Sequence, residues 1–395
     1  MSWLARVSHY KNIAGDSMAG HDVVVIGGSA GALPAVTRIV ERLPSSLPAC
    51  VLVVLHTSSD GFLPDILARA GPLPVAFAKN HDAVEPGRVY VAPPDFHLIV
   101  TSSGLRVVHG PRENGFRPAI DPLFRTAARE FGPRVIGVIL SGALSDGSYG
   151  LSVIKKYGGV AIVQNPEDAL ITSMPANALS AVNVDYVRDA SEIAATIERL
   201  SREPDDVESG LEGNGEMARS RDVEPQLPVE NAEVAEMTTR FGPPSALTCP
   251  DCGGALWEIA DDRIVRYQCH VGHQYGSDAL ESEQRATVDS ALWSAVRVLE
   301  EHADLKGRLA QRAAANGLEH ASEGFAKAAR DAHGQAQTIR SVLFAAASDS
   351  PAMAGATVAA EELPPPMPSK RPDAPRGSEE RQKAHRNFAR ARRRN

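Results

Sequence analysis

The sequence predicts an α/β protein with a doubly wound, mostly parallel sheet, and three observations support this. Short apolar runs rich in β-branched residues recur between residues 21 and 200, for example at 23–26, 51–55 and 135–140. Such runs are typical of strands that are buried on both faces. Segments with helical spacing separate them, as in a sheet covered by helices on both sides. The first run also ends in Gly27-Gly28, which indicates a strand turning into a helix.

The remaining elements of this region follow from the same patterns. We expect further strands at 75–78, 88–91, 98–100 and 160–163, a second hairpin arm at 104–108, and helices at 35–43, 64–70, 122–130, 151–157 and 176–182. In an open parallel sheet the functional site lies at the carboxyl ends of the strands. The chemistry is therefore expected in the turns that follow the strands.

Composition limits the class of protein. The 395 residues give room for about two or three domains, and 43% hydrophobic with 23% charged residues is typical of a soluble globular protein. No apolar run approaches the ~20 residues that a membrane-spanning helix needs, and the first residues lack the pattern of a signal peptide. The four cysteines do not make a disulfide framework, because three of them cluster late in the chain. We expect a cytoplasmic protein without membrane insertion.

Changes in composition along the chain predict its domains. We expect an N-terminal tail at 1–20, a catalytic domain at 21–200, an acidic disordered linker at 201–245, a cysteine-bearing module at 246–280, a helical hairpin at 281–347 and a disordered basic tail at 348–395. Residues 201–240 hold eleven acidic and four basic residues, whereas 370–395 hold ten Lys or Arg against three acids. The net charge of −8 gives no support for a nucleic-acid partner.

The predicted hairpin carries one apolar stripe on each helix. Such a stripe is typical of a docking or self-association element, so a helical partner is one interpretation. Packing of the hairpin on the catalytic domain is the other, and the sequence does not separate them.

Ser29 stands in the turn after the first strand, in the string Gly27-Gly28-Ser29-Ala30-Gly31. Small neighbours permit a tight turn, and the Ala30 amide is placed to donate to an oxyanion formed at the group that Ser29 attacks. Glycine-rich turns more often cradle phosphates, so the string alone is a weak signal. A dinucleotide site, however, needs G-x-G-x-x-G and an acid closing the second strand, and this chain has neither.

His56 closes the second strand, and Asp146 lies in the turn after the run 135–140. Alone, His56 would be read as a surface or hydrogen-bonded residue, and Asp146 as the N-cap of the following helix. Together with Ser29 they place a nucleophile, a base and an orienting acid at three strand ends, which favours a catalytic triad. The order Ser, His, Asp differs from the Ser, Asp, His order of α/β-hydrolases.

Several segments, in this order, resemble the chemotaxis receptor methylesterase family (the CheB-type catalytic domain). They are residues 25–31, the strand ending at His56, residues 89–97, 117–124, 140–147, 164–166, and Met174-Pro175. The resemblance covers roughly residues 22–200 and implies the methylesterase fold. It also implies hydrolysis of γ-glutamyl methyl esters on methylated chemoreceptors or related signalling receptors, giving glutamate and methanol. By motif, Ser29 takes the place of the family's nucleophile, His56 of its base and Asp146 of its orienting acid.

Two departures from the family pattern affect what the resemblance implies. The family usually has a phosphoacceptor receiver domain before the catalytic one, whereas about twenty residues precede the first strand here, so we expect no phospho-gating in cis. Ala143 stands where the family usually carries Met, which predicts a changed oxyanion pocket. Two other functions remain open: a receptor glutamine deamidase that uses the same triad, and a catalytically silent signalling scaffold. A nucleotide-binding protein is the weakest reading.

A second cluster of chemistry-bearing residues lies in the module at 246–280. Cys249 and Cys252 form a Cys-x2-Cys turn, and after sixteen intervening residues Cys269 and His273 form Cys-x3-His. Four such ligands are typical of tetrahedral zinc, and a site filled by four protein ligands is structural. We therefore predict a zinc knuckle and no cofactor for catalysis. His270 could replace His273, although the Gly272 turn favours His273, and Cys50 is expected in the core.

Overall fold

The computed structural model of this protein describes residues 20–56, 61–203, 241–261 and 264–348. Almost all of the predicted N-terminal tail, acidic linker and basic tail lies outside these residues, so the disorder predicted there stays a prediction. Within the described residues, none of the helices combines the length and apolar character needed to cross a membrane.

A seven-stranded sheet forms the centre of the first part of the chain, and every neighbouring pair in it is parallel. Its strand order is β3-β4-β2-β1-β7-β8-β9. The strands are β1 (Val23–Gly28), β2 (Cys50–Leu55), β3 (Val75–Phe77), β4 (Val89–Val91), β7 (Val135–Ile139), β8 (Val160–Gln164) and β9 (Tyr186–Arg188). Since β1 lies between β2 and β7, the order reverses there, at the position where ligand sites form in such sheets.

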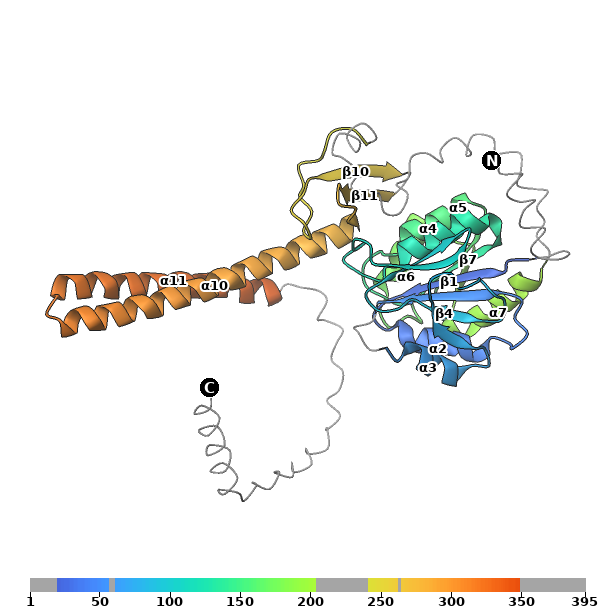
Figure 1. Ribbon diagram of the computed structural model, residues 1–395, viewed down its shortest axis with the longest axis horizontal. Coiled ribbons are helices and arrows are strands. Elements are labelled where there is room, and N and C mark those ends of the chain that lie inside the picture. Colours follow the sequence, from blue (N-terminus) through green and yellow to red (C-terminus); the bar gives the residue numbers. More distant parts are fainter. Residues whose placement is uncertain (1–19, 57–60, 204–240, 262–263, 349–395) are drawn as a thin grey trace, which may run out of the picture. The chain divides into compact units, whose positions relative to one another are not determined.

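Helices cover both faces of the sheet, as Figure 1 shows. They are α2 (Ala32–Arg42), α3 (Leu63–Ala70), α4 (Ile120–Phe131), a short 3-10 turn (Gly132–Arg134), α5 (Ser148–Lys156), α6 (Ser173–Ala181) and α7 (Ala190–Arg202). Alternation along β1 explains the two layers. Val23 and Val25 pack with α4, α5 and α6, whereas Val24 and Ile26 pack with α2, α3 and α7. The predicted doubly wound parallel sheet is therefore confirmed.

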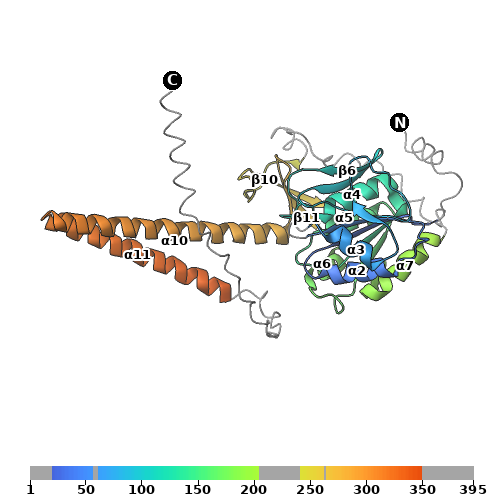
Figure 2. The ribbon, with the colours of Figure 1, turned by 60° about the horizontal axis from the view of Figure 1, so that its bottom comes forward.

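Three differences from the predicted elements have physical reasons. Sequence patterns did not indicate β9, a three-residue edge strand with no apolar run, or α7, where alanines fill part of the buried face beside Ile193, Ile197 and Leu200. The hairpin of β5 (His97–Thr101) and β6 (Gly104–Val108) forms a separate two-stranded sheet rather than part of the main one. It packs beside α4 (Figure 2). Thr126 of α4 accepts a hydrogen bond from the Val100 backbone amide.

The cysteine-bearing module contains a three-stranded antiparallel sheet that was not predicted. Its strands are β10 (Leu256–Asp261), β11 (Ile264–Cys269) and β12 (Gln274–Gly276). The helix α10 (Ser277–Ala315) follows β12 directly and so begins four residues before the predicted hairpin boundary at 281. The chain divides into two compact units, Met1–His302 and Ala303–Asn395, so the division falls inside α10 rather than between module and hairpin.

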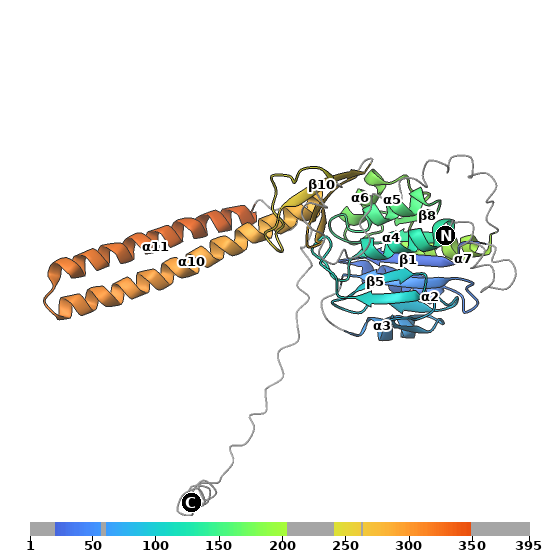
Figure 3. The same cartoon turned by 45° about the horizontal axis from the view of Figure 1, so that its top comes forward.

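The second unit contains the end of α10 and the helix α11 (Glu319–Ser348). The two run antiparallel around a turn at Gly317, whose φ of 72° suits glycine (Figure 3). Ser322 Oγ donates to the carbonyl oxygen of Ala310 at 2.9 Å, which ties the start of α11 to the end of α10. Both predicted helices of the hairpin are present.

Candidate active site

Ser29 occupies the tight turn between β1 and α2. Its amide donates to the carbonyl oxygen of Ser141 at 3.0 Å, which ties the turn to the end of β7. Gly31 has a φ of 77°, and a Cβ atom there would lie 2.8 Å from both Leu170 Cβ and Ser141 Oγ, so the turn needs glycine. Among the described residues, the Ala30 amide donates no hydrogen bond to a backbone carbonyl oxygen. That amide is therefore available for a developing oxyanion.

His56 lies beside Ser29 because of the parallel register of β1 and β2. Gly28 pairs with Leu55, and the His56 amide donates to the Gly28 carbonyl oxygen at 3.1 Å. Ser29 directly follows β1, and His56 directly follows β2. Neighbouring strands lie about 4.8 Å apart, so these two backbones leave the sheet side by side.

The imidazole ring of His56 is almost fully buried, with 2% of its side chain exposed. Its Nε2 atom lies 2.8 Å from Asp146 Oδ2, and the ring stacks on Phe116 with 3.8 Å between centroids. Within the described part of the chain, Nδ1 is buried without a partner, so no hydrogen bond joins it to Ser29 Oγ. Nδ1 is therefore the nitrogen left to accept a proton.

Asp146 is completely buried and receives hydrogen bonds at both oxygens. Oδ2 accepts from His56 and from the Ile120 amide at 2.6 Å, while Oδ1 accepts from Asn114 Nδ2 at 2.8 Å and from the Asp121 amide at 3.3 Å. Burial alone would raise the pKa of this carboxyl, but the bonds from His56, Ile120 and Asn114 outweigh it and hold the pKa below its usual value. Asp146 is therefore ionised and able to orient His56 and stabilise its protonated form.

Asp121, at the start of α4, is a second buried carboxyl next to Asp146. Its Oδ1 accepts from the Gly150 amide at 2.7 Å and its Oδ2 from Asn114 Nδ2 at 3.2 Å. Burial, followed by the charge of Asp146, raises its pKa to about 7. Sequence patterns gave no sign that Asp121, Asn114 or Phe116, whose ring stacks on His56, belong to the site.

Comparison with known proteins identifies the family. A model described as CheB methylesterase matches residues 24–197. A putative protein-glutamate methylesterase/protein-glutamine glutaminase of Leptospira interrogans is 39% identical over 185 residues, which cover 46% of this chain and 96% of that protein. This chain belongs to the CheB methylesterase family.

Other members of the CheB methylesterase family are larger than the region they share with this chain. Protein-glutamate methylesterase/protein-glutamine glutaminase 3 of Anaeromyxobacter dehalogenans is 41% identical over 177 residues, covering 44% of this chain and 52% of that protein. A protein-glutamate methylesterase/protein-glutamine glutaminase of Pyrococcus abyssi is 36% identical over 203 residues, which cover 50% of this chain and 55% of that protein.

The crystal structure of a Thermotoga maritima CheB methylesterase catalytic domain matches with 33% identity, covering 45% of this chain and 98% of that one, at a TM-score of 0.44.

The turn after β7 lines the other side of Ser29 in this CheB-family chain. A Cβ atom at Gly142 would lie 2.9 Å from Ser29 Cβ and 2.7 Å from Met174 Sδ, so glycine lets the serine and α6 approach. Ala143 is exposed in this turn. The changed oxyanion pocket predicted from Ala143 stays a prediction.

The predicted metal ligands Cys249, Cys252, Cys269 and His273 come together, with all four ligand atoms within 4.8 Å of one another. Cys252 Sγ lies 3.7 Å from Cys269 Sγ, and His273 Nδ1 lies 3.6 Å from Cys249 Sγ and 3.5 Å from Cys269 Sγ. Tetrahedral zinc would require edges of about 3.8 Å between sulfurs and about 3.6 Å from sulfur to nitrogen. The cluster therefore fits zinc.

Groups around the cluster support its role as a set of ligands. Tyr275 OH lies 3.6 Å from Cys249 Sγ and donates to Asp251 Oδ2 at 2.5 Å. Asp251 Oδ2 also lies 3.9 Å from His273 Nε2, the nitrogen that faces away from the thiols. A carboxylate behind a ligating histidine is the usual outer partner of a metal site.

Proposed function

We propose that this chain is a protein-glutamate methylesterase, a serine hydrolase that removes methyl groups from esterified glutamate side chains of methyl-accepting chemotaxis receptors or related receptors. Membership in the CheB methylesterase family supports this activity. The observation that carries the site assignment is the register of β1 and β2, which pairs Gly28 with Leu55 so that Ser29 and His56 follow at adjacent strand ends, with His56 Nε2 bonded to the ionised Asp146. Products are the glutamate side chain and methanol.

The reaction follows from the positions of the side chains. His56 Nδ1 takes the hydroxyl proton as Ser29 Oγ bonds to the ester carbonyl carbon, and the Ala30 amide holds the resulting oxyanion. The bond to the methoxy group then breaks, and methanol leaves with the proton from His56. Water, deprotonated by His56, attacks the acyl-serine and releases glutamate and free Ser29. Asp146 keeps Nδ1 facing the serine and offsets the imidazolium charge in both halves.

Deamidation of receptor glutamines is a second candidate activity of the same site. The names of the Leptospira, Anaeromyxobacter and Pyrococcus relatives include protein-glutamine glutaminase, which supports it. The acyl-serine intermediate would be identical, with ammonia leaving in place of methanol. Parallel assays of methanol and ammonia release from methylated and glutamine-bearing receptor fragments separate the two activities.

A direct test of the nucleophile uses a fluorophosphonate probe, which reacts with activated serines. We expect labelling at Ser29 in the full chain, and loss of both labelling and methyl release by several orders of magnitude in Ser29→Ala. Ser102→Ala serves as the control, because Ser102 lies in the turn of the β5–β6 hairpin, which is not part of the seven-stranded sheet that carries Ser29. Methyl release by Ser29→Ala at close to the unsubstituted rate would remove Ser29 from this role.

The other parts of the chain receive assignments that follow from the sequence. We assign the cluster at Cys249, Cys252, Cys269 and His273 to a structural zinc ion, because four protein ligands leave no position for substrate. We assign the hairpin to docking of a helical partner, since Leu305 and Val342 are more than half exposed on its helices. We place the protein in the cytoplasm, in keeping with its four free cysteines.

A further inference from the structure

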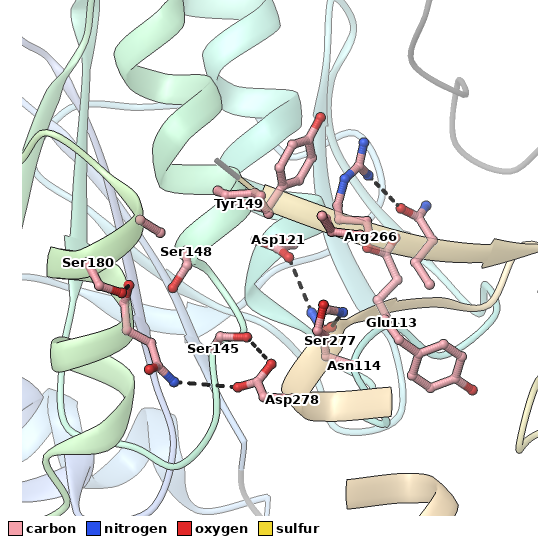
Figure 4. A pocket seen from close by; sticks show the side chains of 17 residues that line it. Glu113, Asn114, Asp121, Ser145, Ser148, Tyr149, Ser180, Arg266, Ser277 and Asp278 are labelled. Carbon is pink, nitrogen blue, oxygen red and sulfur yellow. Dashed lines mark hydrogen bonds between the residues drawn. The ribbon is translucent and has the colours of Figure 1, made fainter. Parts of the chain in front are cut away.

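The cysteine-bearing module contacts the catalytic domain next to Asp146, through β12 and the first turn of α10. The backbone amide of Asn114 donates to the backbone carbonyl oxygen of Gln274 at 2.7 Å, and Glu113 forms a parallel β-bridge with Gln274. Asp278, at the start of α10, accepts from Ser145 Oγ and from Asn177 Nδ2. Figure 4 shows these groups around a cavity of about 300 Å³ that both parts line. The module thus forms hydrogen bonds with two neighbours of Asp146: Asn114, which donates to its carboxylate, and Ser145, which precedes it in the chain.

Both polar atoms of the Asn114 side chain, Oδ1 and Nδ2, form hydrogen bonds. Its Oδ1 accepts from the Gly276 amide at 2.7 Å, and its Nδ2 donates to Asp146 Oδ1 at 2.8 Å and to Asp121 Oδ2 at 3.2 Å. The Gly276 amide can only donate, so it fixes which end of the Asn114 side chain carries the oxygen. The two N–H groups are thereby directed at the carboxylates.

The backbone around Asn114 is itself held firmly. Asn114 is in the left-handed region with φ of 53°, which asparagine tolerates better than most residues. Glu113, the residue before it, forms two hydrogen bonds of 2.8 and 2.9 Å with Arg125 of α4, and each of these side chains is 3% exposed. Segment 113–114 is therefore fixed by α4 on one side and by β12 on the other.

We propose that β12 of the module is part of the device that positions the catalytic acid, acting through Asn114, which is a positioning residue for Asp146. The proposal rests on the methylesterase function and adds a role that neither the family match nor the triad motif assigns, since the matched region ends at residue 197. Without Asn114, Asp146 Oδ1 would keep only the 3.3 Å bond from the Asp121 amide. The carboxylate could then rotate away from His56.

Loss of this donor has a definite consequence for proton binding. A hydrogen bond to an anion stabilises its charged form, so its removal strengthens proton binding by the His56–Asp146 pair, whichever partner holds the proton. The substitution also removes the 3.2 Å bond from Asn114 Nδ2 to Asp121 Oδ2, which strengthens proton binding by that carboxyl in the same direction. The other charged groups near the pair keep their own partners: Arg125, Glu113, His97, Arg266 of β11 and Asp278 of α10. The active form of the enzyme should therefore appear only at higher pH.

The test measures fluorophosphonate labelling of Ser29 in the full chain as a function of pH. Asn114→Gly is the first variant, because glycine adopts the φ of this position freely while the side chain that carries the donor is removed. We expect the acidic limb of the labelling rate to move up by about one pH unit, and the maximal rate to fall roughly tenfold, at unchanged half-saturating probe concentration. A purely structural contact would lower the folded fraction and leave the pH limb where it is.

A second pair of variants tests the module side. Gly276→Pro lacks the N–H that reaches Asn114, whereas Gly276→Ala keeps it and adds the same Cβ atom beside Ser145. The difference between the Pro and Ala variants should reproduce the pH shift of Asn114→Gly, and that difference should disappear when both proteins also carry Asn114→Gly. A Pro variant that does not fold leaves the decision to Asn114→Gly. An unmoved limb in Asn114→Gly overturns the proposal, while absence of Ser29 labelling in the unsubstituted protein overturns the methylesterase site itself.

Discussion

Asp121 and Asp146 share one hydrogen-bond donor, the side-chain amide of Asn114, which lies 3.2 Å from the first carboxylate and 2.8 Å from the second. Both carboxyl groups are buried, and two negative charges this close repel each other strongly in a low dielectric. The larger set of donors surrounds Asp146, so the charge resides there. Burial and the charge of Asp146 raise the pKa of Asp121 to about 7, so this carboxyl is about half protonated at neutral pH and keeps its proton below it.

We expect Asp121→Asn to become more stable relative to the unsubstituted protein as pH rises. The unfolded carboxyl releases its proton near pH 4 and the folded one near pH 7, so the folded state binds more protons between these values. Stability of the unsubstituted protein therefore falls across this window, whereas asparagine does not titrate. Between pH 5 and pH 8 the free energy of unfolding of Asp121→Asn should therefore rise by roughly 2 kcal/mol relative to that of the unsubstituted protein.

Urea unfolding at the two pH values, followed by the signal of the catalytic domain, measures this change. A gap between the two proteins that is the same at pH 5 and pH 8 would show that Asp121 ionises at its ordinary pKa in the folded protein.

The charge of Asp146 gives a prediction for catalysis. Asp146→Asn can still accept a hydrogen bond from His56 but offers no charge to balance the imidazolium formed when Ser29 is deprotonated. We expect methyl release to fall by about three to four orders of magnitude, the scale of the same change in serine-protease triads. Asp168→Asn is the matched control, because Asp168 follows β8 and bonds to Gln164 and the Ala190 amide rather than to His56. Equal rates for the two variants would exclude Asp146 as the orienting acid.

Much of the candidate site could be predicted because it depends on strand ends. Apolar β-branched runs mark β1, β2 and β7, and the carboxyl ends of parallel strands share one edge, so Ser29, His56 and Asp146 could be grouped before any coordinates. The metal ligands likewise follow from short-range spacing, which the structure brings within 4.8 Å.

The groups around the triad could not be predicted, because their roles arise from long-range contacts. Asn114 lies 162 residues from Gly276, and nothing in the local sequence of either residue indicates that they meet. Phe116 and Asp121 stand in a segment whose sequence pattern does not indicate that it lies near His56. The strands of the module were missed for a different reason: polar residues interrupt the apolar pattern of β10 and β11, and β12 has only three residues.

The two histidines of the module provide a sharp test of the metal site. His273 Nδ1 faces Cys249 and Cys269 at 3.6 and 3.5 Å, whereas the ring of His270 lies against Gly254 and is not among the four grouped ligands. We expect the full chain, purified without chelator, to contain about one zinc ion per molecule, and His273→Ala to lose most of it, because three remaining thiolates leave a coordination position open. His270→Ala should retain the metal. Elemental analysis of the three proteins decides this, and zinc lost from His270→Ala but kept by His273→Ala would assign the fourth ligand to His270.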